Sequence, residues 1–151
     1  MIQHIYPNFA TRVVAIAIDF ALLTLIHLFL FFLLAGRLLN EVIDLELLAI
    51  LTAYSWYLVM FAASYVFLHM VYFIVFHAWC GQTIGKMIMH IRVVTEDNRQ
   101  VSPARAFLRW TGYILSSVPL AAGFLWSAVD KDHCAWHDRL SQTRVVSVEM
   151  T

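Results

Sequence analysis

The chain has 151 residues, of which 62% are hydrophobic and only 13% are charged. Soluble domains use about half apolar residues and about a quarter charged ones, so this composition excludes an ordinary soluble protein and predicts surface that faces lipid. Ten basic and ten acidic residues leave no net charge, which excludes the basic footprint of a nucleic-acid-binding protein. The length predicts one domain over residues 1–151.

Two long apolar segments run from about residue 9 to 35 and from about residue 47 to 76. Each exceeds the roughly 20 residues that a helix needs to cross the bilayer core, so both are predicted to be transmembrane helices. The preceding stretch MIQHIYPNFATR has neither the positive cluster nor the cleavage site of a signal peptide. We therefore expect the first helix to stay in the mature protein.

The charges around these segments predict their orientation. The loop after the first segment is acidic, with Glu41, Asp44 and Glu46 against Arg37. The stretch after the second segment carries five cationic residues: Lys86, Arg92, Arg99, Arg105 and Arg109. Positive residues mark the cytoplasmic side of a membrane. We expect a multi-pass protein of the cytoplasmic (inner) membrane, with its N-terminus and residues 79–106 in the cytoplasm.

A third apolar segment, residues 107–129, has the length of a span but has basic residues on both sides. A single crossing conflicts with that charge pattern. Pro119 removes a backbone donor and Gly123 weakens a helix, so these residues favour a re-entrant hairpin of two half-helices. A kinked but complete third span is the alternative, because proline is common in membrane helices.

Two short runs have the pattern of β-strands. IRVV at residues 91–94 and TRVV at residues 143–146 are rich in β-branched residues and share Arg-Val-Val. They predict a small ribbon on one face of the membrane, with two unrelated strand-like runs as the alternative. Ser102-Pro103 is expected to start a helix. The predicted fold is an all-α integral membrane protein with two long transmembrane helices, a third broken or re-entrant hairpin and a small cytoplasmic β-ribbon.

The stretch GQTIGK, residues 81–86, is not a phosphate-binding loop. It is one residue short of the GxxxxGK spacing, Met87 stands where the loop needs a hydroxyl, and no strand precedes it. We expect instead that Gly81 ends the second helix, that Thr83 caps a short helix and that Lys86 reaches the membrane interface.

Three motifs, taken in order, resemble the RDD family of small integral membrane proteins, which is named for one arginine and two aspartates. The matching residues are Arg12 and Asp19 in an R-x6-D motif, Gly81, Gly85 and Lys86 in GQTIGKMIMHIRVV, and His137 and Asp138 in WHDRLSQTRVV. Ile84, Met87 and the stretch LSQT depart from the residues usual in the family. Arg12, Asp19 and Asp138, here called the RDD residues, are intact. The resemblance implies a role in transport, with cation/proton exchange suspected for some members.

Asp19 is the residue of the first helix that most needs a partner. A carboxylate at mid-membrane costs roughly 2.5–3.5 kcal/mol on insertion scales. Asp19 lies seven residues after Arg12, about 10.5 Å along the helix. Helical side chains tilt toward the N-terminus, so Arg12 leans away from Asp19. We expect Arg12 to pair with Asp138 at the interface, and Asp19 to lie deeper, against hydroxyl groups or Arg109.

The two spans offer further polar side chains. On the second helix, Tyr54, Tyr65 and Tyr72 share one face at helical spacing, with His69 close to it. On the first helix, His27 follows Asp19 by two turns and could extend a proton relay. The alternative is a structural, hydrogen-bonded histidine, which is the commoner case within a span.

The stretch HCAWHD, residues 133–138, is a weak candidate for a metal site. His133 and His137 are four residues apart, a spacing that would hold a metal only if the stretch were helical. Cys80 is the only cysteine besides Cys134, and we expect no metal and two reduced cytoplasmic thiols.

Two functions from different classes fit the sequence. The first is transport of a proton or small monovalent cation with Asp19 as the titrating group, by a homo-oligomer, because two spans and a hairpin are too few to enclose a path. The alternative is a non-catalytic scaffold or partner-binding protein of the bilayer in which the RDD residues are structural. Lipid binding by the five cationic residues that follow the second segment is a third, less specific interpretation. No nucleophile–base spacing indicates an enzyme, and we expect no cofactor.

Overall fold

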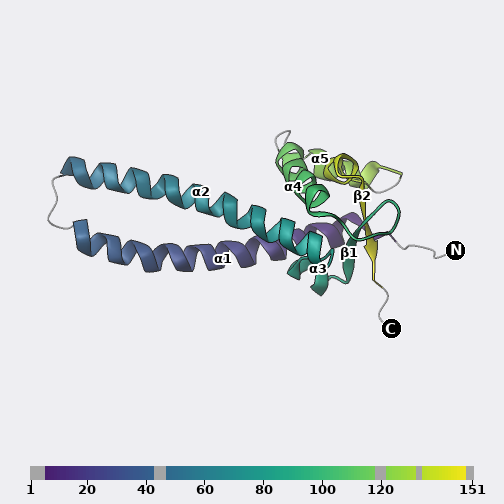
Figure 1. Ribbon diagram of the computed structural model, residues 1–151, viewed down its shortest axis with the longest axis horizontal. Helices are drawn as coiled ribbons and strands as arrows, with labels where there is room; N and C mark the ends of the chain where they lie inside the picture. Colours follow the sequence, from purple (N-terminus) through teal and green to yellow (C-terminus); the bar gives the residue numbers. More distant parts are fainter. Residues whose placement is uncertain (1–5, 43–46, 118–121, 132–133, 149–151) are drawn as a thin grey trace. The chain divides into compact units, whose positions relative to one another are not determined.

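The computed structural model describes residues 6–42, 47–117, 122–131 and 134–148, without the side chains between 38 and 48. Figure 1 labels its elements, which are α1 (Phe9–Val42), α2 (Leu47–Trp79), α3 (Ile84–Ile88), β1 (Ile91–Thr95), α4 (Pro103–Ser117), α5 (Ala122–Val129), α6 (Trp136–Leu140) and β2 (Thr143–Ser147). They fall into two compact units, Phe20–His69 and the remainder of the chain.

The two predicted long apolar helices are present. Phe9–Arg37 of α1 and Ala49–Trp79 of α2 are each long and apolar enough to cross a membrane. Most of the side chains on both helices are apolar, which is the pattern of a helix surrounded by lipid or by other helices rather than of one that lies on a water-soluble core.

In the unit Phe20–His69, α1 and α2 lie side by side (Figure 1). Polar groups join them within this apolar setting. The Tyr57 hydroxyl donates to the Phe31 carbonyl at 2.8 Å, and the Thr24 and Tyr65 hydroxyls share a hydrogen bond of 3.0 Å. Such bonds between helices satisfy polar groups that lipid cannot.

The second unit contains the predicted β-ribbon, which is confirmed. β1 pairs antiparallel with β2, and Val93 lies opposite Val145. Both valines are buried, and they form a core with Ala15 of α1 and with Val101 and Ala106. The alternation of buried and exposed residues along β1 explains why a period of two was legible in the sequence.

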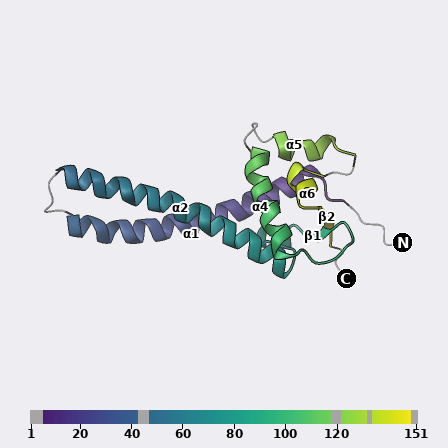
Figure 2. The ribbon, with the colours of Figure 1, turned by 45° about the horizontal axis from the view of Figure 1, so that its top comes forward.

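The third apolar segment is broken into α4 and α5, whose axes are bent by 98° with respect to each other. By length and composition the pair could form a third span or a re-entrant loop. Pro119, on which the predicted hairpin turn depends, lies outside the described residues. α4 begins at Pro103, as the Ser102-Pro103 sequence predicts, and it packs with α5 and α6 (Figure 2).

Candidate functional site

Asp138, on α6, is the centre of a buried ion-pair cluster. Its Oδ2 atom lies 3.1 Å from Nη1 of Arg12, in the first turns of α1, which is the pairing expected from the sequence. Its Oδ1 atom pairs with Nη1 of Arg109 on α4. Asp138 is 0% exposed and Arg109 is 1% exposed. The pair with Arg109 was not expected, because from the sequence that arginine was considered only as one of two alternative partners of Asp19.

Arg109 and Asp138 also form hydrogen bonds with neighbouring elements. Arg109 donates from Nη1 to the Thr143 hydroxyl at 2.6 Å and from Nε to the Tyr113 hydroxyl at 3.3 Å. The backbone N–H of Ala135 donates to Oδ2 of Asp138 at 2.9 Å, so the carboxylate also binds a backbone donor at the start of α6.

These contacts set the protonation of the cluster. Burial would raise the pKa of Asp138, but Arg109, His137 and Arg12 outweigh burial and hold that pKa well below its usual value. Burial lowers the pKa of His137 to about 3, against the opposing attraction of Asp138. At neutral pH the cluster therefore contains a charged carboxylate and a neutral imidazole.

Asp19 binds three donors and has no ion-pair partner among the described residues. Oδ1 accepts from the Tyr72 hydroxyl and from the Gly85 N–H, both at 2.7 Å, and Oδ2 accepts from the Thr83 hydroxyl at 2.5 Å. The residue is 0% exposed. Asp19 therefore lies against hydroxyl groups, as expected, and these belong to Tyr72 and Thr83.

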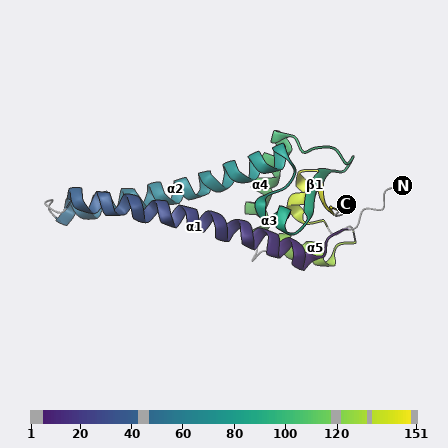
Figure 3. The same ribbon diagram turned by 90° about the horizontal axis from the view of Figure 1, so that it is seen from below.

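The same contacts build the start of α3 against α1 (Figure 3). The first amides of a helix have no partner within the helix. Here the Ile84 N–H donates to the Tyr72 hydroxyl at 2.9 Å and the Gly85 N–H donates to Asp19. Thr83 stands at the predicted cap position but makes no side-chain cap bond, since its hydroxyl donates to Asp19 instead.

At two positions of the GQTIGK stretch, steric constraints explain why the residue is glycine. Gly81 follows α2 with φ of +72°, a left-handed conformation that favours glycine, and this agrees with its predicted place at the end of the second helix. At Gly85, a Cβ atom would collide with the Ala15 carbonyl oxygen and lie 3.0 Å from the Asp19 carboxyl carbon. Only glycine lets the backbone of α3 come this close to α1.

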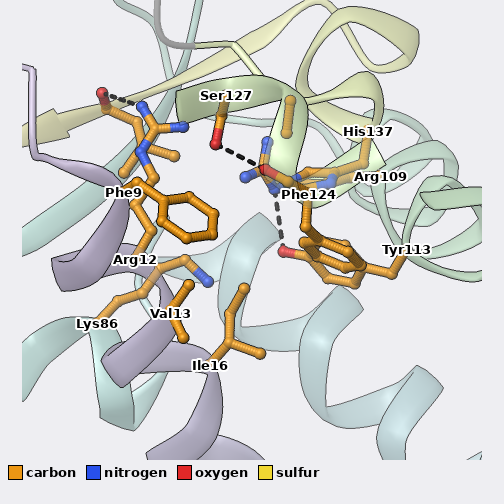
Figure 4. Close-up of a pocket in the computed structure, with 12 residues that line it drawn as sticks. Phe9, Arg12, Val13, Ile16, Lys86, Arg109, Tyr113, Phe124, Ser127 and His137 are labelled. Carbon is orange, nitrogen blue, oxygen red and sulfur yellow. Dashed lines mark hydrogen bonds between the residues drawn. The ribbon is translucent and has the colours of Figure 1, made fainter. Parts of the chain in front are cut away.

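Lys86 does not reach the membrane interface, and that prediction is wrong. The side chain is 3% exposed, and its ammonium lies 5.8 Å from the centre of the Phe73 ring. It lines a cavity of about 30 Å³ together with Arg12 and Arg109 (Figure 4). The prediction treated α3 as a surface helix, whereas Gly85 brings the helix against α1 and turns the next side chain inward.

His27, Tyr65 and His69 belong to the unit Phe20–His69 and contact one another there. The His27 Nε2 atom lies 3.2 Å from the Phe61 carbonyl oxygen, and the His69 Nδ1 atom lies 2.9 Å from the Tyr65 carbonyl oxygen. Each imidazole thus has a backbone partner, as the structural interpretation of His27 expects. Tyr54 is exposed.

In the described ranges, no group of three or more His, Cys, Asp or Glu residues could hold a metal ion. His133 of the HCAWHD stretch lies outside those ranges. His137 packs against the rings of Tyr113 and Phe124, and its Nδ1 atom lies 3.5 Å from the Ser116 hydroxyl. Cys80 and Cys134 form no disulfide.

Sequence reasoning missed Thr83 and Gly85 as partners of Asp19, and Thr143 as a partner of Arg109. The signal available was the short TIG stretch directly after a helix end, because a helix that starts there must find partners for its first amides. Nothing in the sequence says that the partner is a carboxylate 66 residues earlier in the chain.

Comparison with known proteins agrees with these features. A model of the RDD family matches residues 6–142. The uncharacterized protein YxaI of Bacillus subtilis (strain 168) is 36% identical over 64 residues, which are 42% of this chain and 42% of YxaI. No solved structure matches. Since the matched region contains all the RDD residues and most of the chain, the protein belongs to the RDD family of membrane proteins.

Proposed function

We propose that the protein is a non-enzymatic scaffold of the cytoplasmic membrane, in which the RDD residues fasten the polar elements to the first helix so that they present one surface to a partner. The observation that carries this proposal is that each RDD carboxylate joins elements far apart in the sequence. Asp138 on α6 binds α1 and α4. Asp19 on α1 binds the end of α2 and the start of α3.

The three hydrogen bonds that Asp19 accepts support a structural role. A carboxylate offers about four acceptor sites to donors. Three protein donors use them here, and one is a backbone amide that cannot rotate away. Release of Asp19 would leave this amide and the Thr83 hydroxyl buried without their partner, which costs about 1–3 kcal/mol for each group.

The surface for a partner lies on α3 and α4, outside the two spans. The exposed apolar side chains on these helices include Met87 and Ile88 on α3 and Phe107 and Leu108 on α4. Exposed apolar groups of this size mark contacts with protein or with acyl chains. We assign this surface to another membrane protein rather than to a soluble one.

The experiment compares Asp19→Asn, Arg12→Ala and Asp138→Asn with a matched control, Asp97→Asn, which changes an exposed aspartate. We expect the three RDD variants to lose folded, monodisperse protein in detergent, and the control to behave as the wild type does. If Asp19→Asn folds and assembles normally, the scaffold proposal for that residue fails.

Transport of a proton or small monovalent cation by a homo-oligomer is the second candidate. One observation favours it: Asp19 is buried, without a cationic partner among the described residues, and has about one acceptor site left. An unpaired carboxylate within a span is a candidate ion site. An assembly of several copies would supply the walls that two spans cannot.

Flux measurements test this second candidate. Purified protein in proteoliposomes would move protons or sodium down an imposed gradient, and Asp19→Asn would lose the flux while keeping the fold. Asp97→Asn would keep both. Flux that Asp19→Asn leaves unchanged excludes a role for that carboxylate in transport, and normal folding of the same variant separates this result from the scaffold proposal.

The strand pairing supports the re-entrant arrangement of α4 and α5. β1 and β2 pair, and two paired strands are expected to share one side of a membrane. The chain between them must then cross an even number of times, whereas one complete span would be a single crossing. We propose that α4 and α5 enter and leave on this side, and the surplus of basic residues there supports the cytoplasm as its compartment.

A further inference from the structure

The Lys86 ammonium is a buried charge without a hydrogen-bond acceptor. The side chain is 3% exposed, and no acceptor among the described residues reaches its Nζ atom. Figure 4 shows Nζ directed into the cavity between Phe9, Val13 and Ile16 of α1 on one side and Phe124 on the other. An ammonium has three donors, and burial without a partner is costly for each.

The charges around the cavity do not balance. Three cationic side chains line it, Arg12, Lys86 and Arg109. The buried carboxylates of this unit that face them are Asp138, which pairs with both arginines, and Asp19, whose oxygens take neutral donors. Among the described residues the cluster thus has one positive charge more than negative charges. The buried imidazoles of His77 and His137 add no negative charge.

The cavity has room for a small ion. Its volume is about 30 Å³, above the roughly 10–15 Å³ that a cavity needs to hold one water molecule. Besides Lys86, the Nε–H of Arg12 also lacks an acceptor among the described residues, and Arg12 lines the same space. The cavity is not fully enclosed, and Val13 of α1 is part of its lining.

We propose that this cavity binds one small monovalent anion of the size of chloride, held by the Lys86 ammonium with Arg12 beside it. Such an anion accepts the unused donors and cancels the surplus charge, whereas a water molecule would satisfy only the hydrogen bonds. Sulfate, phosphate and gluconate are all larger than chloride, so we expect them to fit this small cavity less well. Burial lowers the pKa of Lys86, which agrees with a buried ammonium that forms no ion pair with the described carboxylates.

The first experiment measures the unfolding temperature of the full chain in an uncharged detergent without phosphate. Chloride replaces gluconate at constant ionic strength, so that general screening stays fixed. Binding to the folded state alone raises the Tm with chloride concentration, by about 5 °C once chloride exceeds its Kd by ~100-fold. A Tm that is the same in both salts would overturn the proposal.

Variants locate the effect. Lys86→Met removes the charge at similar volume, so we expect it to abolish the chloride dependence and to make the protein at least as stable as the wild type in gluconate. Lys131→Met is the matched control, because Lys131 is exposed, and it should keep the full chloride dependence. A chloride effect that survives in Lys86→Met places the anion elsewhere and contradicts the proposal.

Crystals of the wild-type protein grown in bromide decide the site directly, even if Lys86→Met does not fold. The expected result is an anomalous peak within hydrogen-bond distance of the Lys86 Nζ atom. Density there without anomalous signal indicates water only and overturns the proposal, as does a peak confined to other parts of the protein.

Discussion

Among single residues, Asp138 is the one whose neutralisation leaves the most charge uncompensated. It faces Arg12 and Arg109 within a region that is closed to solvent. Removal of one partner from a buried ion pair costs more than the pair itself contributes, because the remaining charge stays desolvated. Asp138 therefore matters chiefly because its loss would leave the charges of Arg12 and Arg109 buried and unpaired, rather than because the ion pairs are strongly attractive overall.

We predict that Asp138→Asn lowers the free energy of unfolding by about 3–5 kcal/mol, since both arginines lose the one carboxylate that pairs with them among the described residues. Thermal unfolding followed by tryptophan fluorescence in detergent measures the change. The exposed Asp97→Asn is the control, with an effect within about 0.5 kcal/mol. Equal stability of the two variants would mean that the ion pairs contribute nothing in the membrane protein.

Burial of His137 makes the stability of the protein depend on pH. Its pKa in the folded protein is about 3, below the ordinary value of about 6.5 that applies to the unfolded chain. The stability that it contributes is present in full above pH ~6.5 and falls by about 1.4 kcal/mol per pH unit as the pH drops from there toward ~3. The lowered pKa of Asp138 also stabilises the folded state, and this contribution is lost only below about pH 4.

Between about pH 6.5 and pH 5, the free energy of unfolding of the wild type should fall as the pH drops. We therefore predict that this fall is smaller in His137→Gln, by the slope of about 1.4 kcal/mol per pH unit that corresponds to uptake of one proton. Urea or thermal unfolding at several pH values provides the slope. His90→Gln, which changes an exposed histidine, is the control and should leave the slope as it is. An unchanged slope in His137→Gln would contradict burial of a neutral imidazole.

At the scale of elements, α3 is too short to be stable alone, because helices shorter than about 12–15 residues are marginal in water. It spans five residues, Ile84–Ile88. Its position depends on Gly85, which lies against the Ala15 carbonyl, and on the amides bound by Tyr72 and Asp19. The glycine and the aspartate are thus parts of one junction between α1 and α3.

We predict that Gly85→Ala lowers stability by roughly 1–3 kcal/mol, since the added methyl group collides with backbone rather than with a flexible side chain. Gly36→Ala is the matched control, because a Cβ atom at Gly36 has no neighbour within 4 Å. The measurement is the unfolding temperature in detergent. A tolerated Gly85→Ala would show that α3 can lie away from α1.

At the scale of the whole molecule, the pairing of β1 with β2 links the two ends of the polar part of the chain. Arg12 at the start of α1 also bonds to β2, through the Val145 carbonyl at 3.5 Å. The start of α1, β1 and β2 therefore lie together in the fold, and we propose that they share one side of the membrane. This constraint on topology comes from contacts and is independent of the charge rule.

We predict that an impermeant maleimide applied to intact cells labels a cysteine placed at Gly36 but not cysteines placed at Asp97 or Val148, in a chain whose Cys80 and Cys134 are replaced by serine. Asp97 follows β1 and Val148 follows β2, whereas Gly36 is near the far end of the first span. Labelling at Val148 from outside would mean that α4 and α5 make a complete crossing.

How much of this could be predicted depends on the range of the interactions involved. The two spans, the two strands and the start of α4 follow from periodicity and composition along short stretches, and the structure contains all of them. Lys86 was misplaced because the orientation of a five-residue helix depends on its neighbours rather than on its own pattern. Likewise, the partners of Asp19 come from segments 53 to 66 residues away.

The sequence by itself determined that this is a membrane protein with two apolar helices, a ribbon of two matching strands and three charged residues that need partners, because hydrophobicity and charge are properties of the residues themselves. Only the tertiary structure decided which charges meet. Asp138 takes both arginines, Asp19 takes neutral donors, and Lys86 is left facing a cavity. Those pairings depend on how closely helices approach, and that approach is fixed by packing across the fold rather than by any local stretch of chain.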